Sequence, residues 1–306
     1  MSQLIALTGA TGFIGSSLLQ TLTASGLSVR ALVRRPGALR AQPGLELIQG
    51  DLDCPASLGR LVKDCDAVVH LAGAIAGRRY IDFARINAAG TARLVGAMER
   101  FQPGARLILV SSLAAREPQL SHYAASKRAA ETLVESSALD WLILRPPAVY
   151  GPEDPALAPL WAMLARGVLL RAGPPEARFS LLHVDDLRRA ILQLLEIPTL
   201  GGATQCLDDG KPGGYCWAEV AETAAAVRGR TVKMLPLPGP VLHTAARVNL
   251  MLSRLRTSPP VLNPGKVREL THIDWVCDSK LACVLQPWSP QRTLESALPE
   301  LPGWRQ

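Results

Sequence analysis

The stretch Leu4–Gly15 reads LIALTGATGFIG, an apolar run followed by three glycines with the spacing G-x-x-G-x-x-G. In such a loop the first glycine permits a tight turn, the second lets the backbone approach a pyrophosphate, and the third allows close helix–strand packing. A helix that begins directly after the loop points its N-terminal amides at phosphate groups. The stretch therefore predicts a strand, a helix and, between them, a dinucleotide-binding loop with the contact residues Gly9, Thr11, Gly12, Phe13, Ile14 and Gly15.

The alternation of short apolar runs and helical patterns continues to about residue 150. Strands are predicted over 4–8, 28–33, 45–48, 67–71, 107–111 and 141–144, and helices over 13–25, 56–63, 81–101 and 122–138. This order predicts an α/β fold with a Rossmann-type, doubly wound parallel sheet. After Tyr150 prolines break the chain into shorter elements, with helices predicted over 185–195, 217–228 and 241–256. We expect residues 1–150 to bind the cofactor and residues 151–306 to form a smaller, mixed substrate lobe, from which short segments can return to the sheet.

The second predicted strand ends in Arg34 and Arg35, where an NAD enzyme normally places an acid for the ribose 2′-hydroxyl. A guanidinium pairs with a 2′-phosphate, so the two arginines favour NADP(H), while NAD(H) stays open if they are only solvated side chains. Further cofactor contacts are expected where the third and fourth strands end. These are Asp51 and Leu52 at the adenine, and the small residues Ala72 and Gly73 beneath the cofactor.

Tyr123 and Lys127 are spaced i and i+4, so a helix places them on one face. A phenol titrates near pH 10, and a neighbouring ammonium group lowers its pKa enough for acid–base catalysis. Tyr123 is thus predicted to protonate a ketone oxygen as hydride arrives, and Lys127 to contact the nicotinamide ribose. Ser112, at the end of the fifth strand, is predicted to donate to the developing alkoxide, with Ser111 as the alternative.

Together these motifs resemble the extended short-chain dehydrogenase/reductases, the epimerase/dehydratase superfamily that includes 3β-hydroxysteroid dehydrogenase. The resemblance also rests on NAAGT at 87–91, RPPAVYGP at 145–152 and HVDDL at 183–187, and it runs from residue 4 to about 190. It implies a Rossmann fold, an Asn87 that lies near the catalytic site, a nicotinamide covered by Pro146 and Val149, and a homodimer. Nothing in the pattern implies a metal.

Positions at which the sequence departs from the family's motifs narrow the range of possible substrates. Leu113 and Ala114 follow Ser112, where sugar dehydratases of this family carry Asp-Glu, and the segment 262–266 lacks the arginine and acid typical of nucleotide-sugar epimerases. The late segment 258–275 resembles bacterial sphingolipid ketoreductases. The leading hypothesis is therefore NADPH-dependent reduction of a ketone in an amphipathic, lipid-like small molecule, such as a 3-keto sphingoid base or a ceramide. A nucleotide-sugar epimerase and a non-catalytic, cofactor-binding structural subunit remain alternatives.

Charge is distributed unevenly along the chain, whose net charge is +7. Residues 223–268 contain no acid and no Phe, Tyr or Trp, but eight basic residues, which argues against a nucleic-acid partner because single strands are bound by stacking on rings. Contact with an anionic membrane stays open. In the predicted helix 241–256, Arg247 and Arg254 share one side, and the opposite face carries Val241, Ala245, Val248, Leu252 and Leu255. That apolar face either lies at a membrane interface or docks on the protein core.

No apolar run is long enough to cross a bilayer, and a strand that begins at Leu4 leaves no room for a signal peptide. The six cysteines include no C-x-x-C pair, so we expect reduced thiols rather than disulfides or a zinc site. The sequence predicts a cytoplasmic protein, with contact at the cytoplasmic face of a membrane left open.

Overall fold

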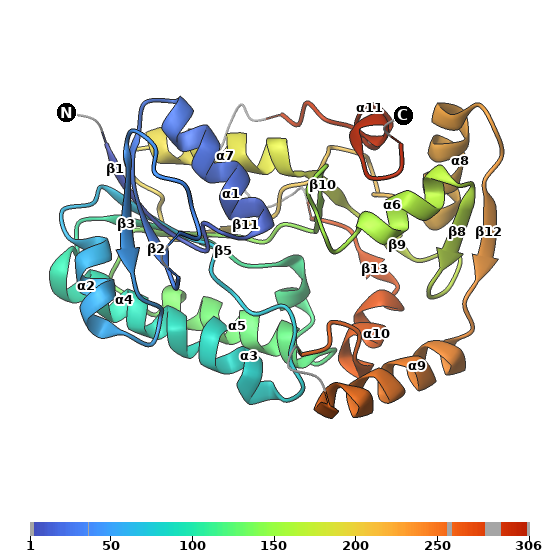
Figure 1. Ribbon diagram of the computed structural model, residues 1–306, viewed down its shortest axis with the longest axis horizontal. Coiled ribbons are helices and arrows are strands. Elements are labelled where there is room, and N and C mark those ends of the chain that lie inside the picture. Colours follow the sequence, from blue (N-terminus) through green and yellow to red (C-terminus); the bar gives the residue numbers. More distant parts are fainter. Residues whose placement is uncertain (1–2, 36, 256–258, 279–288, 305–306) are drawn as a thin grey trace. The chain divides into compact units, whose positions relative to one another are not determined.

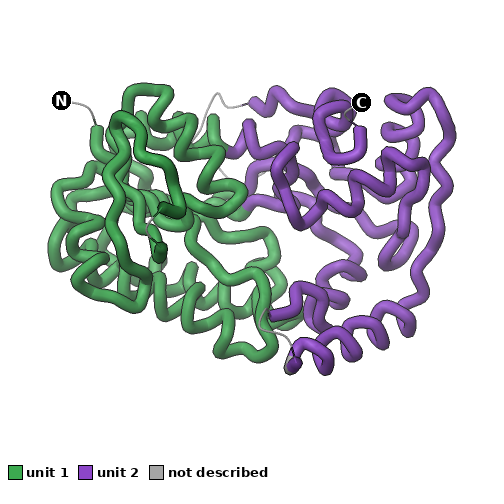
Figure 2. The backbone as a smooth tube through the Cα atoms, viewed as in Figure 1, with its two compact units in different colours: residues 1–145, 188–205, 281–286 green, residues 146–187, 206–280, 287–306 purple. Residues whose placement is uncertain are grey.

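The computed structural model describes residues 3–35, 37–255, 259–278 and 289–304 (Figure 1). The chain divides into two compact units (Figure 2). Of the described residues, the first unit takes 3–145 and 188–205, and the second takes 146–187 and those from 206 onward. Each unit has its own hydrophobic core.

The first unit is built on a parallel sheet. Its described strands are β1 (Leu4–Thr8), β2 (Ser28–Val33), β3 (Leu45–Gln49), β4 (Ala67–His70), β5 (Arg106–Val110), β6 (Trp141–Leu144) and β11 (Ala203–Gln205). They lie in the order β11-β6-β5-β4-β1-β2-β3, and each neighbouring pair is parallel. The predicted doubly wound Rossmann sheet is confirmed. Its strand order reverses between β1 and β4, where such sheets bind ligands.

Helices cover both faces of this sheet (Figure 1). One face carries α1 (Phe13–Ala24) and α7 (Val184–Glu196), which are joined by a hydrogen bond of 2.9 Å from the Arg188 guanidinium to the Thr21 hydroxyl. The other face carries α2 (Pro55–Val62), α3 (Tyr80–Asn87), α4 (Ala89–Phe101) and α5 (His122–Glu135). Because both faces are covered, β4 is buried along its whole length, as its apolar sequence requires.

The helix predicted over 81–101 is interrupted at Ala88, which ends α3 and precedes α4. The break directly follows Asn87, whose side chain bonds to the backbone of Ala74 instead of lying on the helix surface. Strand β11 was not predicted as a strand, because its three residues, ATQ, form no apolar run. It forms through its parallel pairing with β6.

The described part of the second unit contains three short parallel strand pairs: β7 (Ala148–Tyr150) with β10 (Leu181–His183), β8 (Val168–Arg171) with β12 (Lys233–Pro236), and β9 (Arg178–Phe179) with β13 (Asp274–Trp275). Its helices include α6 (Ala158–Ala165), α8 (Trp217–Arg228), α9 (Gly239–Leu252), α10 (Pro264–Leu270) and α11 (Leu294–Ala297). Tyr150, Trp161 and Leu298 lie in its core.

The structure adds elements of the second unit that the sequence did not predict. Leu235 and Pro236 belong to β12. The described residues after 258 contain α10, β13 and α11. Helix α10 begins at a proline and is capped by Asn263, whose Oδ1 accepts the Lys266 backbone amide at 3.0 Å.

The helix predicted over 241–256 runs over Gly239–Leu252 and continues as a 3-10 turn at Ser253–Leu255. Arg256 lies outside the described residues. Of the two alternatives for its apolar stripe, docking on the core is wrong, because Val241 and Val248 are exposed and Ala246 is the residue of α9 that is fully buried. In the described part of the chain, no helix has the length and hydropathy needed to span a bilayer.

Candidate active site

The glycine loop between β1 and α1 is packed too closely to admit side chains. Gly9 has φ +75°, and a Cβ on it would lie 2.7 Å from the Ala72 amide nitrogen. A Cβ on Gly15 would lie 2.0 Å from the carbonyl oxygen of Gly9. The loop, the first turn of α1 and the chain after β4 are therefore held together through backbone contact, as the glycine spacing predicts.

The start of α1 is open to an anionic ligand. Gly12 is the N-cap residue, no side chain among the described residues caps the helix, and Thr11 and Gly12 are exposed. Free N-terminal amides bind phosphate through hydrogen bonds and the helix dipole. This arrangement fits the pyrophosphate of a dinucleotide, with Phe13, Ile14 and Gly15 forming the turn that follows.

Asn87 lies at the centre of the predicted catalytic group and is almost completely buried. Its Oδ1 accepts the Ala74 amide at 2.7 Å, and its Nδ2 donates to the Ala74 carbonyl at 3.0 Å and to Ser126 Oγ at 2.8 Å. A Cβ on Gly73 would lie 3.2 Å from Asn87 Oδ1 and 3.8 Å from Lys127 Nζ. The structure thus brings Gly73, Asn87 and Lys127 together from three separate segments.

Lys127 is buried on α5 and bonded to the neighbouring strand. Its ammonium group donates to the carbonyl oxygen of Val110, the last residue of β5, at 2.9 Å. Burial lowers the pKa of Lys127 to about 8, against the opposing attraction of Glu131. The lysine is therefore held close to its titration point, a state that burial imposes on basic groups.

Tyr123 lies in the first turn of the same helix and is half-buried. Its ring meets that of Phe83 edge-on, with centroids 6.3 Å apart. This first turn is fixed by Ser121, whose Oγ accepts the Ala124 amide at 2.9 Å, and by Ser126, whose hydroxyl donates to the Tyr123 carbonyl at 2.7 Å. Sequence reasoning missed Ser126, although it lies within the Tyr-x-x-x-Lys motif.

The two candidate serines have different surroundings. Ser112 is half-buried and caps the 3-10 turn Leu113–Arg116, its Oγ accepting the Ala114 amide at 3.2 Å. That contact uses a lone pair and leaves the hydroxyl hydrogen available for donation. Ser111 Oγ is buried and has no hydrogen-bond partner among the described residues.

His70, the last residue of β4, bridges two parts of the site. Its Nδ1 lies 2.6 Å from Thr8 Oγ1, and its Nε2 lies 2.9 Å from Thr91 Oγ1. Thr91 already donates its hydrogen to the Asn87 carbonyl at 2.6 Å, so it accepts from Nε2–H. The Nδ1 atom of the neutral ring is then an acceptor for the Thr8 hydroxyl, which in turn accepts the Ala72 amide at 3.2 Å.

This chain of hydrogen bonds requires a neutral imidazole. Burial, assisted by the positive charge of Lys127, lowers the pKa of His70 to about 3. The NAAGT motif could have drawn attention to Thr91, but no spacing rule predicts that Thr91 contacts His70.

The other residues predicted to contact the cofactor lie on several different segments of the chain. Arg34 and Arg35 are exposed directly after β2. Asp51 is exposed after β3 and accepts the Asp53 amide at 2.9 Å. Leu52 is buried, and a Cβ on Gly90 would lie 2.7 Å from its Cδ1. Pro146 and Val149 belong to the second unit, Pro146 just before β7 and Val149 within it.

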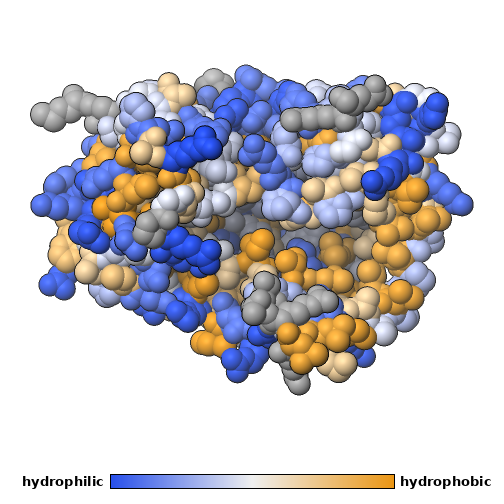
Figure 3. Space-filling view, in the orientation of Figure 1, coloured by the Kyte–Doolittle hydropathy of each residue, from blue (hydrophilic) through white to orange (hydrophobic). Residues whose placement is uncertain are grey.

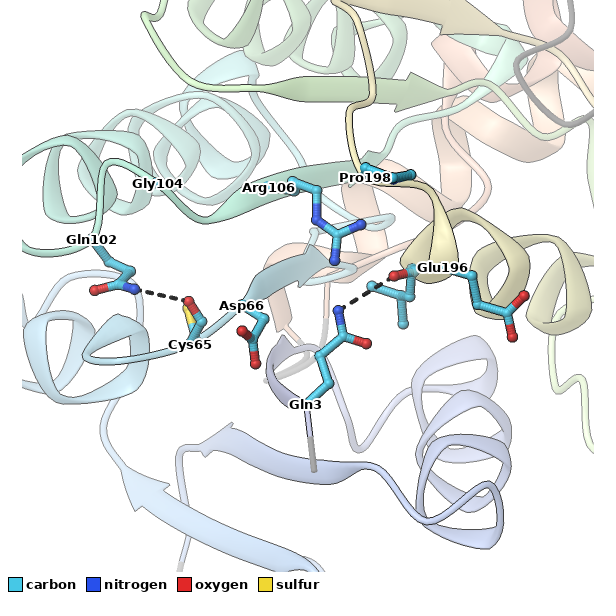
Figure 4. Close-up of a pocket in the computed structure, with 9 residues that line it drawn as sticks. Gln3, Cys65, Asp66, Gln102, Gly104, Arg106, Glu196 and Pro198 are labelled. Atoms are coloured by element: carbon cyan, nitrogen blue, oxygen red, sulfur yellow. Dashed lines mark hydrogen bonds between the residues drawn. The ribbon is translucent and has the colours of Figure 1, made fainter. Parts of the chain in front are cut away.

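A cavity of about 550 Å³ in the first unit lies away from these residues (Figure 4). It is bounded by residues at the amino ends of β1, β4 and β5, including Gln3, Asp66 and Arg106. Gln3 donates to the Leu195 carbonyl at 3.3 Å, and Arg106 donates to the carbonyl of Ile197. Because open α/β sheets bind ligands at the carboxyl ends of their strands, this cavity is not the candidate site.

Comparison with known proteins agrees with the fold and the motifs. The family described as "NAD dependent epimerase/dehydratase family" matches residues 5–205. The chain is 40% identical over 277 residues to "Ceramide reductase" of Caulobacter vibrioides, covering 90% of this chain and 86% of that protein. It is 29% identical over 284 residues to "2-alkyl-3-oxoalkanoate reductase" of Shewanella oneidensis, covering 79% and 72%.

Among solved structures, "MoeE5 in complex with UDP-glucuronic acid and NAD" aligns with a TM-score of 0.73 at 24% identity, covering 99% of this chain and 98% of that one. At this identity the likeness shows the fold alone. The sequence matches and the glycine loop establish the class: the chain belongs to the NAD dependent epimerase/dehydratase family. It is an NAD(P)-dependent oxidoreductase of the extended short-chain dehydrogenase/reductase type, so the resemblance seen in the sequence is confirmed.

Proposed function

We propose that this oxidoreductase uses NADPH to reduce a ketone in a long-chain, lipid-like substrate, such as a 3-keto sphingoid base or a ceramide. The observation that carries the proposal is the 40% identity, over 90% of the chain, to a protein named ceramide reductase. The similarity to 2-alkyl-3-oxoalkanoate reductase supports the same class of reaction, reduction of a 3-keto compound.

The residues of the first unit account for the proton side of this reaction. Bound NADPH supplies the hydride that adds to the carbonyl carbon. Tyr123 donates its phenolic proton to the carbonyl oxygen, and the hydroxyl of Ser112 donates a hydrogen bond to the same oxygen as negative charge develops. Lys127 stabilises the phenolate that remains and binds the nicotinamide ribose, while Asn87 holds the loop at Gly73 and Ala74 in place.

Arg34 and Arg35 are proposed to select NADPH over NADH through the 2′-phosphate, because both are exposed at the carboxyl end of β2. Replacing Arg34 with Ala should weaken NADPH binding about ten- to a hundredfold and leave NADH binding almost unchanged. The control is Arg40→Ala, which removes an exposed arginine of the same segment. Titration of each variant with both nucleotides measures the effect, and an unaltered preference in Arg34→Ala would remove this assignment.

The activity itself is tested with purified protein, NADPH and a 3-keto sphingoid base or 3-keto ceramide, following nucleotide oxidation and the alcohol product by mass spectrometry. Tyr123→Phe should lower kcat at least about a hundredfold while NADPH still binds, and Tyr80→Phe, at an exposed tyrosine, should not. Absence of turnover with every long-chain 3-keto substrate would overturn the proposed substrate class. Full activity in Tyr123→Phe would overturn the mechanism.

A nucleotide-sugar epimerase is the less favoured assignment. An epimerase of this kind needs a basic group for the diphosphate of its substrate. Arg178, which lies shortly before the HVDDL motif, instead forms an ion pair of 3.2 Å with Glu219 and donates to the carbonyls of Gly213 and Gly214. These contacts lie within the second unit and occupy the guanidinium. Tight binding of a UDP-sugar together with retained NAD would reverse this ranking. Cytoplasmic location and homodimer formation stay predictions.

A further inference from the structure

Helix α9 turns its apolar stripe away from the unit to which it belongs. Val241 is 56% exposed, Val248 46% and Met251 62%. The opposite side of the helix packs through Ala246, which is fully buried, and through Asn249, whose Nδ2 donates to the Leu262 carbonyl at 2.7 Å. The helix thus leaves Val241, Val248 and Met251 exposed, whereas an ordinary surface helix turns such apolar residues inward.

The exposed apolar surface continues beyond the helix. Leu252 is 40% exposed, Leu255 88% and Val261 49%. Figure 3 shows hydrophobic residues gathered at the end of α9. We call the set the α9 surface: Val241, Val248, Met251, Leu252, Leu255 and Val261. Contiguous apolar surface of this kind marks a site of contact with a partner or a membrane.

The segment of the chain that carries this surface is basic. Residues 223–268 contain no acid, and Arg247, on α9 itself, is exposed beside the stripe. The eight basic residues of the segment are Arg228, Arg230, Lys233, Arg247, Arg254, Arg256, Lys266 and Arg268. An apolar helix face with an exposed arginine beside it, in a basic segment, is complementary to a bilayer with anionic lipids: the apolar residues contact the hydrocarbon and the arginine contacts the phosphates.

We propose that the α9 surface docks on the headgroup region of a bilayer that contains anionic lipids. A second copy of the chain fits less well, because a two-fold contact through this surface brings Arg247 of both copies into the same interface. Membrane docking follows from exposure and charge and is independent of the proposed reaction. It would place a reductase of lipid-like molecules where such molecules are found.

The test is flotation of the full chain with vesicles of phosphatidylcholine, with and without phosphatidylglycerol. We expect binding to the anionic vesicles that weakens as salt is raised. Val248→Gln combined with Met251→Gln should reduce that binding about tenfold or more, and Arg247→Gln about fivefold. The matched control is Phe101→Gln with Leu133→Gln, which removes two exposed apolar residues of the first unit.

Because all these positions are exposed, the variants should fold, which circular dichroism and NADPH binding verify. Equal binding of wild type and the α9 variants, or no binding to anionic vesicles, would overturn the proposal. So would a dimer, detected by light scattering, that the α9 substitutions dissociate, since the surface would then belong to a second copy.

Discussion

The ammonium group of Lys127 donates to the carbonyl oxygen of Val110, so a cation of helix α5 is held on the last residue of strand β5. The contact lies directly before Ser111 and Ser112, and it couples the helix that carries Tyr123 to the strand that leads to the serines. It holds the Lys127 ammonium group at a buried position, where loss of solvation disfavours the charged form. Stability and activity should therefore respond in opposite directions when Lys127 is replaced.

Lys127→Met should stabilise the protein at neutral pH by roughly 2 kcal/mol and abolish turnover. The folded pKa of about 8 lies below the unfolded value of 10.5, so below pH 8 the folded state bears the cost of the buried charge. The lost hydrogen bond to Val110 offsets part of the gain. As pH rises from 8 to 10.5 the wild type should approach the variant in free energy of unfolding.

Urea unfolding across that pH range measures the difference between the two proteins. Lys63→Met, at an exposed lysine, should show no such pH dependence. A constant gap between wild type and Lys127→Met would contradict a depressed pKa.

His70→Ala should destabilise the first unit by about 2–5 kcal/mol at neutral pH, because it leaves the hydroxyls of Thr8 and Thr91 without their shared partner. The folded pKa of about 3 lies below the usual 6.5, so protons bind the unfolded chain first as pH falls. The wild type should therefore lose stability relative to His70→Ala from pH 6.5 downward. Denaturation at several pH values tests this, with exposed His122→Ala as control.

Ser112→Ala should lower kcat about a hundredfold or more, whereas Ser111→Ala should leave kcat nearly unchanged. Ser112 has a free hydroxyl hydrogen and partial exposure, whereas Ser111 Oγ is buried. Removing the unpaired Ser111 hydroxyl should be neutral or slightly stabilising, and loss of the Ser112 cap should cost about 1 kcal/mol. Steady-state kinetics and thermal unfolding of both variants decide the assignment, and the reverse kinetic pattern would transfer the role to Ser111.

Gly15→Ala should destabilise the protein by more than about 3 kcal/mol and remove dinucleotide binding, since its methyl group would overlap the Gly9 carbonyl. Gly96→Ala, in the middle of α4 with open space around it, should instead stabilise by about 0.5–1 kcal/mol. Thermal unfolding and nucleotide titration compare the pair. Normal binding by Gly15→Ala would refute the close packing of this loop.

The features predicted correctly from the sequence are those set by local pattern. The spacing of Gly9, Gly12 and Gly15 predicted the turn, and buried apolar runs predicted six strands of the sheet because parallel strands are covered on both faces. Lys127 and Asn87 were expected near one another, and each lies beside Gly73. The roles assigned to these side chains stay predictions.

What could not be predicted depends on contacts between distant segments. Strand β11 has no apolar pattern of its own and exists through its pairing with β6. The orientation of α9 is set by Ala246 and Asn249, whereas the periodicity of its apolar residues was compatible with either face inward. The hydrogen bonds of His70 join residues that are 62 and 21 positions apart, which no spacing rule relates.

The return of β11 to the sheet has a consequence for synthesis and for truncation. Until Gln205 has left the ribosome, strand β6 is an unpaired edge whose Leu142, Ile143 and Leu144 are fully buried in the finished protein. An apolar edge of this kind pairs readily with other chains. A fragment that ends near residue 150 would keep that edge permanently and should aggregate, whereas one that also contains the segment up to residue 205 can close it.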